Sequence, residues 1–167
     1  MPNINSFKSQ LSSSCGLLLG NRYKVVMSKI TGDNFIYYCN KVTLPSIEFT
    51  QLDLDTGGHV IHVPHKMTLG NLELTFFNTG AELVKFHQWC DQNMYIHDTH
   101  AIGYYDDVKM NIVVMEYNIA NKLAISRTFT GCILTSISAV NLTYESASAL
   151  QEFTIGFTCS SIAVTNS

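Results

Sequence analysis

The sequence predicts a mainly β domain, an antiparallel β-barrel or sandwich with one covering α-helix. Aromatic and β-branched residues recur in short runs along the whole 167-residue chain, as they do in strands. The run Phe153–Cys159 alternates apolar and polar side chains at the two-residue period of a half-buried strand. A single segment, after Asn78, carries apolar residues at helical spacing. Groups of strands before and after a single helix in the sequence indicate an antiparallel fold rather than alternating βα units.

The N-terminal region divides into an arm and the start of the domain. Residues 1–20 are Ser-rich and weakly patterned, so we expect an arm there and a single domain over 21–167. Two β-rich runs, Tyr23–Met27 and Phe35–Cys39, flank a Thr-Gly-Asp-Asn turn and predict a hairpin. Pro45 ends the second strand because proline donates no hydrogen bond to a ladder.

The segment Ser46–Pro64 is the least regular of the chain and has Gly57-Gly58 in its middle. Its ends, Ile47–Phe49 and His59–Val63, are interpreted as strands of a long, protruding hairpin. After it, Leu72–Phe76 alternates strictly and predicts a half-buried strand.

The one predicted helix begins at Asn78 or Thr79, either of which can cap it, and has Glu82 in its first turn. We expect it to end near Asn93 and to be followed by a loop over His97–Asp107. Its apolar stripe consists of Leu83, Phe86, Trp89 and Cys90.

Four more strands are expected after that loop. Val108–Tyr117 and Leu123–Thr130 form a hairpin, Ile133–Tyr144 follows the break at Gly131-Cys132, and the alternating run near the C-terminus is the last strand.

The composition points to a surface that meets other protein. Charged residues are only 14%, the net charge is −3, and Ser, Thr and Asn number 43. Eight Lys and two Arg are too few for a strongly basic nucleic-acid binder. No apolar run approaches the roughly 20 residues of a membrane span, so we expect no membrane insertion.

No catalytic, cofactor-binding or metal site is predicted. His59, His62 and His65 form the only pattern that resembles a metal cluster, but strand geometry puts His62 on the opposite face from the other two. The His97–Asp107 segment is interpreted as a polar loop, and Asp53 and Asp55 as a charged strand edge. No nucleophile motif or phosphate-binding glycine loop occurs in the sequence.

The five cysteines have long, irregular gaps and no C-x-x-C spacing, which argues against a zinc knuckle or a thioredoxin-type motif. Three of them lie in strand-like runs, where a buried thiol is common, so we expect reduced cysteines. Disulfides formed later, in an oxidising environment, remain the alternative.

Asn21-Arg22-Tyr23-Lys24-Val25 opens one predicted strand, and Cys39 through Pro45 ends the next. These segments resemble the Arg-Pro-Asn-x-Phe-x-Val start and the Cys-Lys-x-x-x-Leu-Pro of the tail tube proteins of contractile-tail bacteriophages. Ile61–Val63, the alternating strand Leu72–Phe76 and the Phe86-x-x-Trp89 pair of the helix follow in the family's order. The C-terminal part from Phe129 to Phe157 resembles both the tube protein and the related tube-initiating baseplate protein.

The resemblance implies a structural subunit of hexameric rings, stacked into a hollow tube whose lumen conducts DNA during ejection. Strand alternation and the apolar stripe of the helix then divide the residues into two sets. Those facing the core under the helix are Leu83, Phe86, Trp89, Phe153, Ile155 and Phe157. Those facing the lumen are Glu73, Thr75, Glu152, Thr154 and Thr158. A lining of hydroxyls and a few carboxylates suits DNA passage, because cations there would pair with phosphates.

The loop Gln51–Val60 is the expected contact between adjacent rings, because it is long, contains glycines and is edged by β-capable residues. The residues assigned to this contact are Asp53, Leu54, Asp55, Gly57, Gly58 and His59. The resemblance also implies the partners: further copies of the chain, the tail sheath protein, the tape measure protein, and baseplate and tail terminator proteins. It places the chain in the virion tail, assembled in the host cytoplasm.

Two other interpretations stay open at this point. One is a related tube-fold protein, either the baseplate tube initiator or a type VI secretion tube subunit. The other is a monomeric β-sandwich that binds a metal through the histidine-bearing loops, as an enzyme or a binding module.

Overall fold

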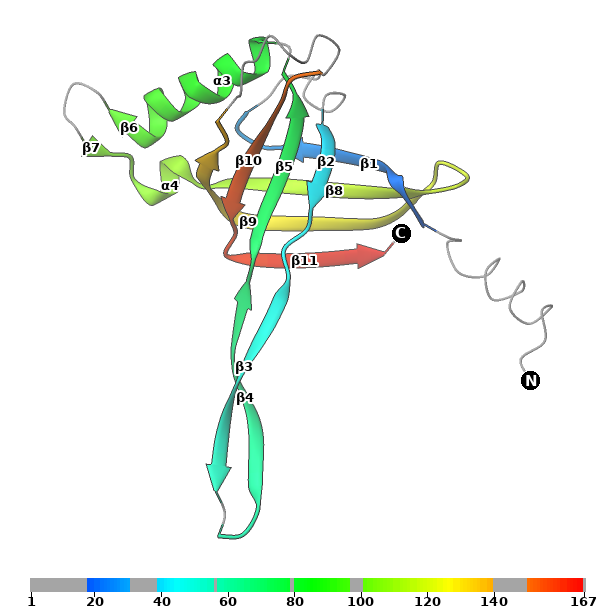
Figure 1. The fold of residues 1–167 in the computed structure, drawn as a ribbon, viewed down its shortest axis with the longest axis vertical. Coiled ribbons are helices and arrows are strands. Elements are labelled where there is room, and N and C mark those ends of the chain that lie inside the picture. Colours follow the sequence, from blue (N-terminus) through cyan, green and yellow to red (C-terminus); the bar gives the residue numbers. More distant parts are fainter. Residues whose placement is uncertain are drawn as a thin grey trace.

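The computed structural model describes residues 18–30, 39–55, 57–78, 80–96, 101–139 and 150–166. Its strands and helices follow each other as shown in Figure 1. The strands are β1 (Leu18–Met27), β2 (Cys39–Thr43), β3 (Ile47–Asp55), β4 (Val60–Leu69), β5 (Asn71–Phe77), β6 (Tyr95–Ile96), β7 (Ala101–Ile102), β8 (Met110–Asn118), β9 (Leu123–Ile137), β10 (Glu152–Thr158) and β11 (Ser161–Asn166). The helical segments are α3 (Ala81–Trp89), a π-helical turn η1 (Cys90–Met94) and α4 (Tyr105–Val108).

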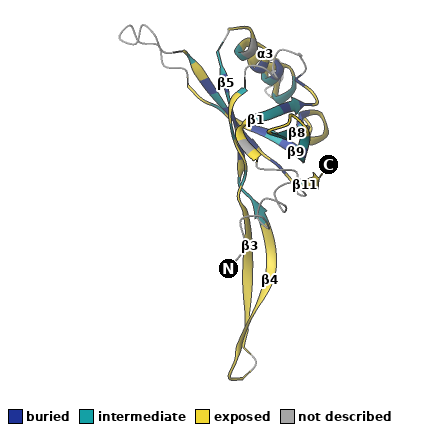
Figure 2. Cartoon of the chain, turned by 90° about the vertical axis from the view of Figure 1, so that its right-hand side faces the viewer, coloured by how far each residue is buried: buried dark blue, intermediate teal, exposed yellow. Residues whose placement is uncertain are grey.

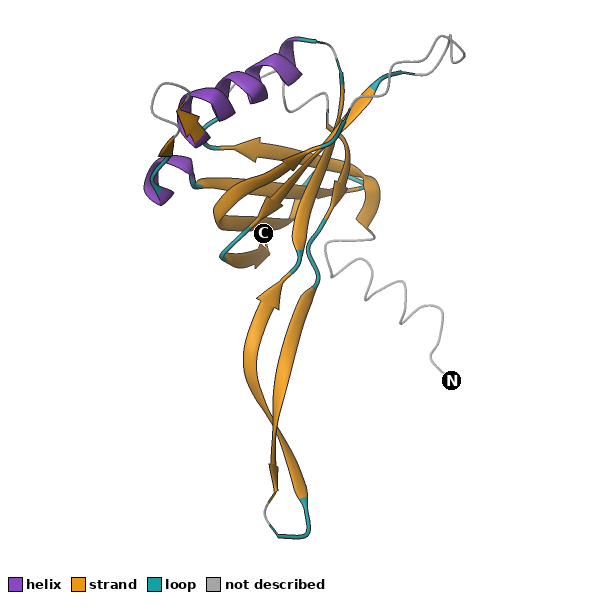
Figure 3. Cartoon of the chain, turned by 60° about the vertical axis from the view of Figure 1, so that its left-hand side comes forward, coloured by secondary structure: helices purple, strands orange, loops and turns teal. Residues whose placement is uncertain are grey.

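Two antiparallel sheets share the long strand β9 and cross each other steeply (Figures 1 and 3). In the first, called the β8 sheet, β1 pairs with β8, β8 with the first part of β9, and that part with β11. In the second, called the β10 sheet, residues 133–137 of β9 pair with β10, which is followed by β5 and β2. The predicted fold class, a mainly antiparallel β structure with one principal helix, is confirmed.

Strand β9 passes from one sheet to the other at Gly131. This residue has φ +61°, and a Cβ atom there would lie 2.8 Å from Ser160 Oγ and 2.9 Å from the Tyr105 hydroxyl. Only glycine fits this bend, because it tolerates a positive φ and has no side chain. The prediction of separate strands before and after Gly131-Cys132 is therefore wrong, since β9 continues through the bend as one strand.

The core lies between the two sheets. Apolar side chains of β5 and β10 point inward at every second position, and Phe153, Ile155 and Phe157 are at most 1% exposed. The β8 sheet contributes Val25, Ile112, Val114 and Phe129 from the other side. The two-residue period of the sequence thus coincides with the burial pattern of β5 and β10.

Helix α3 lies beside one end of β5 and β10 (Figure 1). Its Phe86 is fully buried, with its ring centroid 5.8 Å from that of Phe76 and 6.1 Å from that of Phe153. Offset and tilted ring pairs at this spacing add to the energy of apolar burial. The helix begins later than expected, with Gly80 at the N-cap, and Asn78 Oδ1 accepts a hydrogen bond from the Gly80 amide at 2.9 Å. Residue 79, the other expected cap, lies outside the described residues.

The expected hairpin between residues 23–27 and 35–39 falls largely outside the described residues, because residues 31–38 are not described. Among the described residues, β1 pairs with β8. Of the predicted second strand only Cys39 lies within the described residues, and it begins β2, which ends at Thr43 before Pro45. The described β1 starts at Leu18, inside the segment interpreted as an arm.

Three other expectations need correction or fall outside the described residues. The described part of the predicted His97–Asp107 loop contains β7 and most of α4. The predicted strand over 133–144 ends at Ile137, and residues 140–149 are not described. Strand β11, which pairs with residues 125–130 of β9, was not predicted.

Cys132 and Cys159 form a disulfide that joins β9 to the end of β10, contrary to the expectation of reduced cysteines. Both are buried, and their sequence separation is 27 residues. Spacing alone does not reveal this pair, because sheet pairing brings the two residues together. Of the other described cysteines, Cys39 and Cys90 are free.

The β3–β4 hairpin stands away from the two sheets as a long two-stranded ribbon (Figures 1 and 2). Both predicted ends, Ile47–Phe49 and His59–Val63, fall in or next to its strands, and the ladder continues through most of the segment expected to be a loop. Gly57 and Gly58, with φ of +79° and +142°, make the turn. No side chain of β3 is buried, and of β4 only the last two residues are half-buried.

Candidate assembly surfaces

The outer face of the β10 sheet, opposite the core, is mainly polar, with Phe77 at the end of β5 as an apolar residue on the same side. The side chains that alternate with the buried ones on β5 and β10 include all five residues predicted to face a lumen: Glu73, Thr75, Glu152, Thr154 and Thr158. Cross-strand register brings them together, since Thr75 pairs with Thr154, and Glu73 with Gly156. We call this surface the polar face.

Hydrogen bonds connect the polar face across its strands. The hydroxyls of Thr75 and Thr154 lie 3.0 Å apart, and the Thr158 hydroxyl donates to Asn71 Oδ1 at 3.2 Å. At the end near the helix, Asn40 Nδ2 donates to Glu152 Oε1 at 2.6 Å. Thr75 and Thr154 are half-buried, whereas Glu73, Glu152 and Thr158 are exposed. Several polar groups of the face are therefore hydrogen-bonded to one another, and Glu73, Glu152 and Thr158 are exposed to the surroundings.

Sequence reasoning missed one cation on this face. Lys41 of β2 pairs with Thr75, so it lies on the same side of the sheet as that residue. Together with Glu73 and Glu152 it leaves the face with a formal charge of −1 from these three groups. In the sequence, Lys41 stands next to the apolar Val42, which suggests that the two face opposite sides of the strand. The irregular pairing between Cys39 and Lys41 makes the outward-facing residues of β2 hard to identify from alternation.

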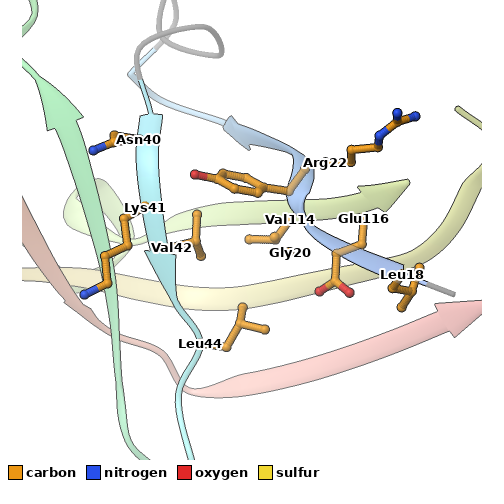
Figure 4. A pocket seen from close by; sticks show the side chains of 10 residues that line it. Leu18, Gly20, Arg22, Asn40, Lys41, Val42, Leu44, Val114 and Glu116 are labelled. Carbon is orange, nitrogen blue, oxygen red and sulfur yellow. The ribbon is translucent and has the colours of Figure 1, made fainter. Parts of the chain in front are cut away.

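Two edges of the β10 sheet have no partner strand among the described residues. Strand β2 pairs only with β5, and residues 133–137 of β9 pair only with β10. Near the first edge, β2 faces β1 across a pocket of about 390 Å³ (Figure 4). Arg22, Val114 and Glu116 line it with residues of β2, and the Tyr23 hydroxyl donates to the Cys39 carbonyl at 3.2 Å. An open strand edge is a site where another chain can add a strand.

The residues predicted to contact an adjacent ring lie at the far end of the β3–β4 hairpin. Asp53, Leu54 and Asp55 are on β3, and Gly57, Gly58 and His59 form the turn and its return to β4. Asp55 Oδ1 accepts the Gly57 amide at 2.9 Å, which stabilises the turn. All six residues are exposed.

The histidines of the hairpin do not converge. His62 Nδ1 lies 2.5 Å from Asp53 Oδ1, a cross-strand pair in which both side chains are more than half exposed. Nowhere in the described ranges do three His, Cys, Asp or Glu residues gather as metal ligands would. His97 and His100, the two histidines of the segment predicted to be a polar loop, lie outside the described residues. Likewise, no described helix is long and apolar enough to cross a membrane.

Comparison of the sequence with family models matches residues 4–164 to a family described as phage tail tube protein. No curated protein matches the sequence.

Several solved structures share the fold of this chain. A chain of the PVC sheath–tube complex, in the extended state of an extracellular contractile injection system, has a TM-score of 0.72 at 15% identity and covers 95% of this chain and 97% of its own. A chain of the tube-terminating cap of the anti-feeding prophage has a TM-score of 0.67 at 13% identity, with 90% and 92% coverage. A type six secretion system protein has a TM-score of 0.54 at 13% identity, with 85% and 81% coverage.

Proposed function

The chain belongs to the phage tail tube protein family, and from this premise we propose that it forms hexameric rings, stacked into a tube whose lumen conducts DNA during ejection. It is a structural subunit of the tail tube in a phage or phage-like contractile particle. The observation that carries the proposal is the polar face, a broad hydroxyl-rich surface directly opposite a fully apolar core.

The two open edges of the β10 sheet support ring formation. If β2 of one subunit pairs with residues 133–137 of β9 in the next, the β10 sheets of all subunits in a ring join into one closed sheet. No strand edge of these sheets is then exposed. Six copies of a four-stranded sheet exceed the roughly 16–18 strands at which a barrel encloses an aqueous channel.

The chemistry of the polar face supports DNA passage. Proteins bind DNA mainly by placing Lys and Arg against its phosphates, with release of counterions. On this face Lys41 is outnumbered by Glu73 and Glu152, and Thr75, Thr154 and Thr158 are uncharged. Such a lining offers DNA little affinity, which is the property that rapid ejection requires.

The β3–β4 hairpin supports stacking. We propose that its far end, Asp53 to His59, contacts a subunit of the adjacent ring. Deletion of residues 53–59 is expected to give a soluble, folded subunit that no longer polymerises. Normal tubes after this deletion would contradict the role of the hairpin.

The proposal extends to the partners of a tube. Similar structures include a sheath–tube complex, a baseplate and a sheath/tube terminator, so we propose a tail sheath, a baseplate and a terminator protein as partners here. A tape measure protein inside the lumen and assembly in the host cytoplasm before incorporation into the virion tail belong to the same proposal.

Negative-stain microscopy of the purified full-length chain tests this function. Long hollow tubes are the expected result. Isolated rings would favour a tube initiator or a secretion tube subunit. Monomers that bind zinc would favour the metal-binding module and contradict a tube.

A further inference from the structure

The β3–β4 hairpin carries two separate apolar patches. Ile47 pairs with Leu69, and Phe49 with Met67, at the end near the sheets; we call these four residues the base patch. Leu52 pairs with Val63, and Leu54 with Ile61, nearer the turn; these four are the distal patch. Seven of the eight side chains are between 38% and 62% exposed, and Leu69 is half-buried.

The two patches lie on opposite faces of the ribbon. Successive residues of a strand alternate between faces, so Leu52, three positions after Phe49, faces the other way. On β4 the same switch depends on a bulge. Thr50 pairs with Lys66 and Gln51 with Pro64, so His65 is an extra residue on β4 at this point. Without it, Val63 would share a face with Met67. Because of the bulge, Val63 and Ile61 of β4 pair with Leu52 and Leu54 of β3, on the face opposite to that of the base patch.

Polar pairs occupy the reverse of each patch. Behind the base patch, Thr50 pairs with Lys66, and Glu48 with Thr68. Behind the distal patch, Asp53 pairs with His62, and their side chains lie 2.5 Å apart. Pro64 and the exposed Val60, which pair with Gln51 and Asp55, lie on the same side as Asp53, so the reverse of the distal patch is mixed. The side of the ribbon on which apolar residues pair with apolar residues thus changes at the bulge.

An isolated two-stranded ribbon with this much exposed apolar surface needs a partner to cover it. The partner is not expected to add a strand to the outer edge of β4, because Pro64 has no N–H and His65 interrupts the ladder. The outer edge of β3 and the side-chain faces are left for contact, and the exposed apolar side chains lie on the faces.

A second copy of this chain is the occupant that matches these surfaces. Every subunit of the tube carries the hairpin, so whatever covers it must be present in equal number along the whole assembly. Only residues 44–46 separate the base patch from β2, whose open edge faces the ring neighbour in the proposed tube. The Ser46 carbonyl accepts the Gly70 amide at 2.9 Å, which ties the start of β3 to the junction of β4 and β5. The distal patch begins five residues beyond Ile47, roughly 17 Å further out at 3.3 Å per residue.

We propose that two different copies of the chain cover the two patches: the neighbour in the same ring covers the base patch, and a subunit of the adjacent ring covers the distal patch. This inference rests on the proposed tube function. The bulge at His65 is then the device that lets one hairpin present an apolar face first to one neighbour and then to the other.

Two charge substitutions separate the contacts. Phe49→Glu places a carboxylate in the base patch, and Leu54→Glu places one in the distal patch. Both side chains are largely exposed, so each variant is expected to keep the wild-type circular dichroism spectrum and thermal midpoint. Glu48→Lys, on the reverse of the base patch, is the matched control and is expected to polymerise like the wild type.

Sedimentation velocity and negative-stain microscopy of the three full-length variants provide the readout. Leu54→Glu is expected to stop at single rings, with complete loss of tubes, and Phe49→Glu to lose the rings as well and sediment as a monomer. Tubes from either variant, arrest of both at the same species, or the reversed order would overturn the inference. A wild-type chain that forms neither rings nor tubes would instead contradict the proposed function.

Discussion

The hydroxyl oxygens of Thr75 and Thr154 lie 3.0 Å apart at the centre of the polar face, on paired strands whose neighbouring residues form the core. On the other side of the same sheet, the ring centroids of Phe76 and Phe153 are 5.7 Å apart. The sheet thus separates a dry aromatic cluster from a hydrogen-bonded polar surface by the thickness of one backbone layer. This relationship requires that the two sides respond differently to substitution.

Thr158→Lys is expected to leave tubes intact and to slow DNA release. Thr158 is exposed on the polar face, so a lysine fits there, and it would repeat around every ring as a phosphate-binding cation. The measurement is the rate of DNA release from particles that carry the variant, at low and high salt. Slowing should weaken as salt rises, since each phosphate contact contributes about 0.9 to the slope of log affinity against log salt.

Thr154→Lys should behave differently, because Thr154 is half-buried against Thr75. Tubes that fail to assemble with lysine at 154 but form with lysine at 158 would show that the centre of the face is packed and its edge is open. Thr158→Gln is the control for side-chain size. An unchanged release rate for Thr158→Lys at low salt would contradict a lumenal position.

Phe86→Ala is expected to destabilise the subunit by about 3–5 kcal/mol, through lost burial and a cavity next to Phe76 and Phe153. Val84→Ala on the same helix, where the side chain is 51% exposed, should change the unfolding free energy by no more than about 0.5 kcal/mol. Urea unfolding of both variants, under conditions that keep the chain unassembled, measures the difference. Equal effects would mean that α3 does not pack on the β10 sheet as described.

The sequence predicts this layered arrangement where the pattern is local. Alternation in β5 and β10 identifies their buried and polar sides, and Phe86 and Trp89 identify the buried side of α3, because these periods follow directly from backbone geometry. The polar face follows from the same alternation. Each of these predictions depends only on residues that are close together in the sequence.

Features that depend on distant residues were missed. Strand β1 pairs with β8, almost ninety residues away, and no local signal in the sequence indicates this pairing. Gly131 looks like a break because glycine usually ends strands, yet here it lets β9 cross from one sheet to the other. The short, mostly polar β11 was overlooked because its alternation is weak and its pairing with β9 is what makes it a strand.

The pairing of Cys132 with Cys159 predicts the number of reactive thiols. Unfolded, unreduced protein should have at most three of its five cysteines available to iodoacetamide, and all five after reduction. Peptide mass spectrometry identifies the linked pair. Five labelled cysteines without reductant would contradict the disulfide. Replacing both cysteines with alanine should lower the unfolding free energy by about 2–4 kcal/mol.

Stability should fall at high pH because of Tyr23 and Cys39. Burial raises the pKa of the Cys39 thiol from 9.0 to about 12. Burial, with the adjacent Cys39, raises the pKa of Tyr23 from 10.0 to about 12. Both groups stay protonated in the folded chain at a pH where the unfolded chain has lost those protons, so their contribution is complete below about pH 9 and declines toward pH 12.

The measurement for this effect is the urea midpoint at pH 8 and pH 11. Tyr23→Phe, which keeps the ring and removes the hydroxyl that donates to the Cys39 carbonyl, should lose less stability over this interval than the wild type. An identical decline in both proteins would show that Tyr23 does not contribute.

The most direct test of the account is a cryo-EM reconstruction of tubes assembled from the full-length chain. We expect six subunits per ring, with β2 of each paired to β9 of the next, and with Glu73, Thr154 and Thr158 lining the channel. A reconstruction in which the polar face is buried against another subunit, or in which α3 lines the channel, would contradict it.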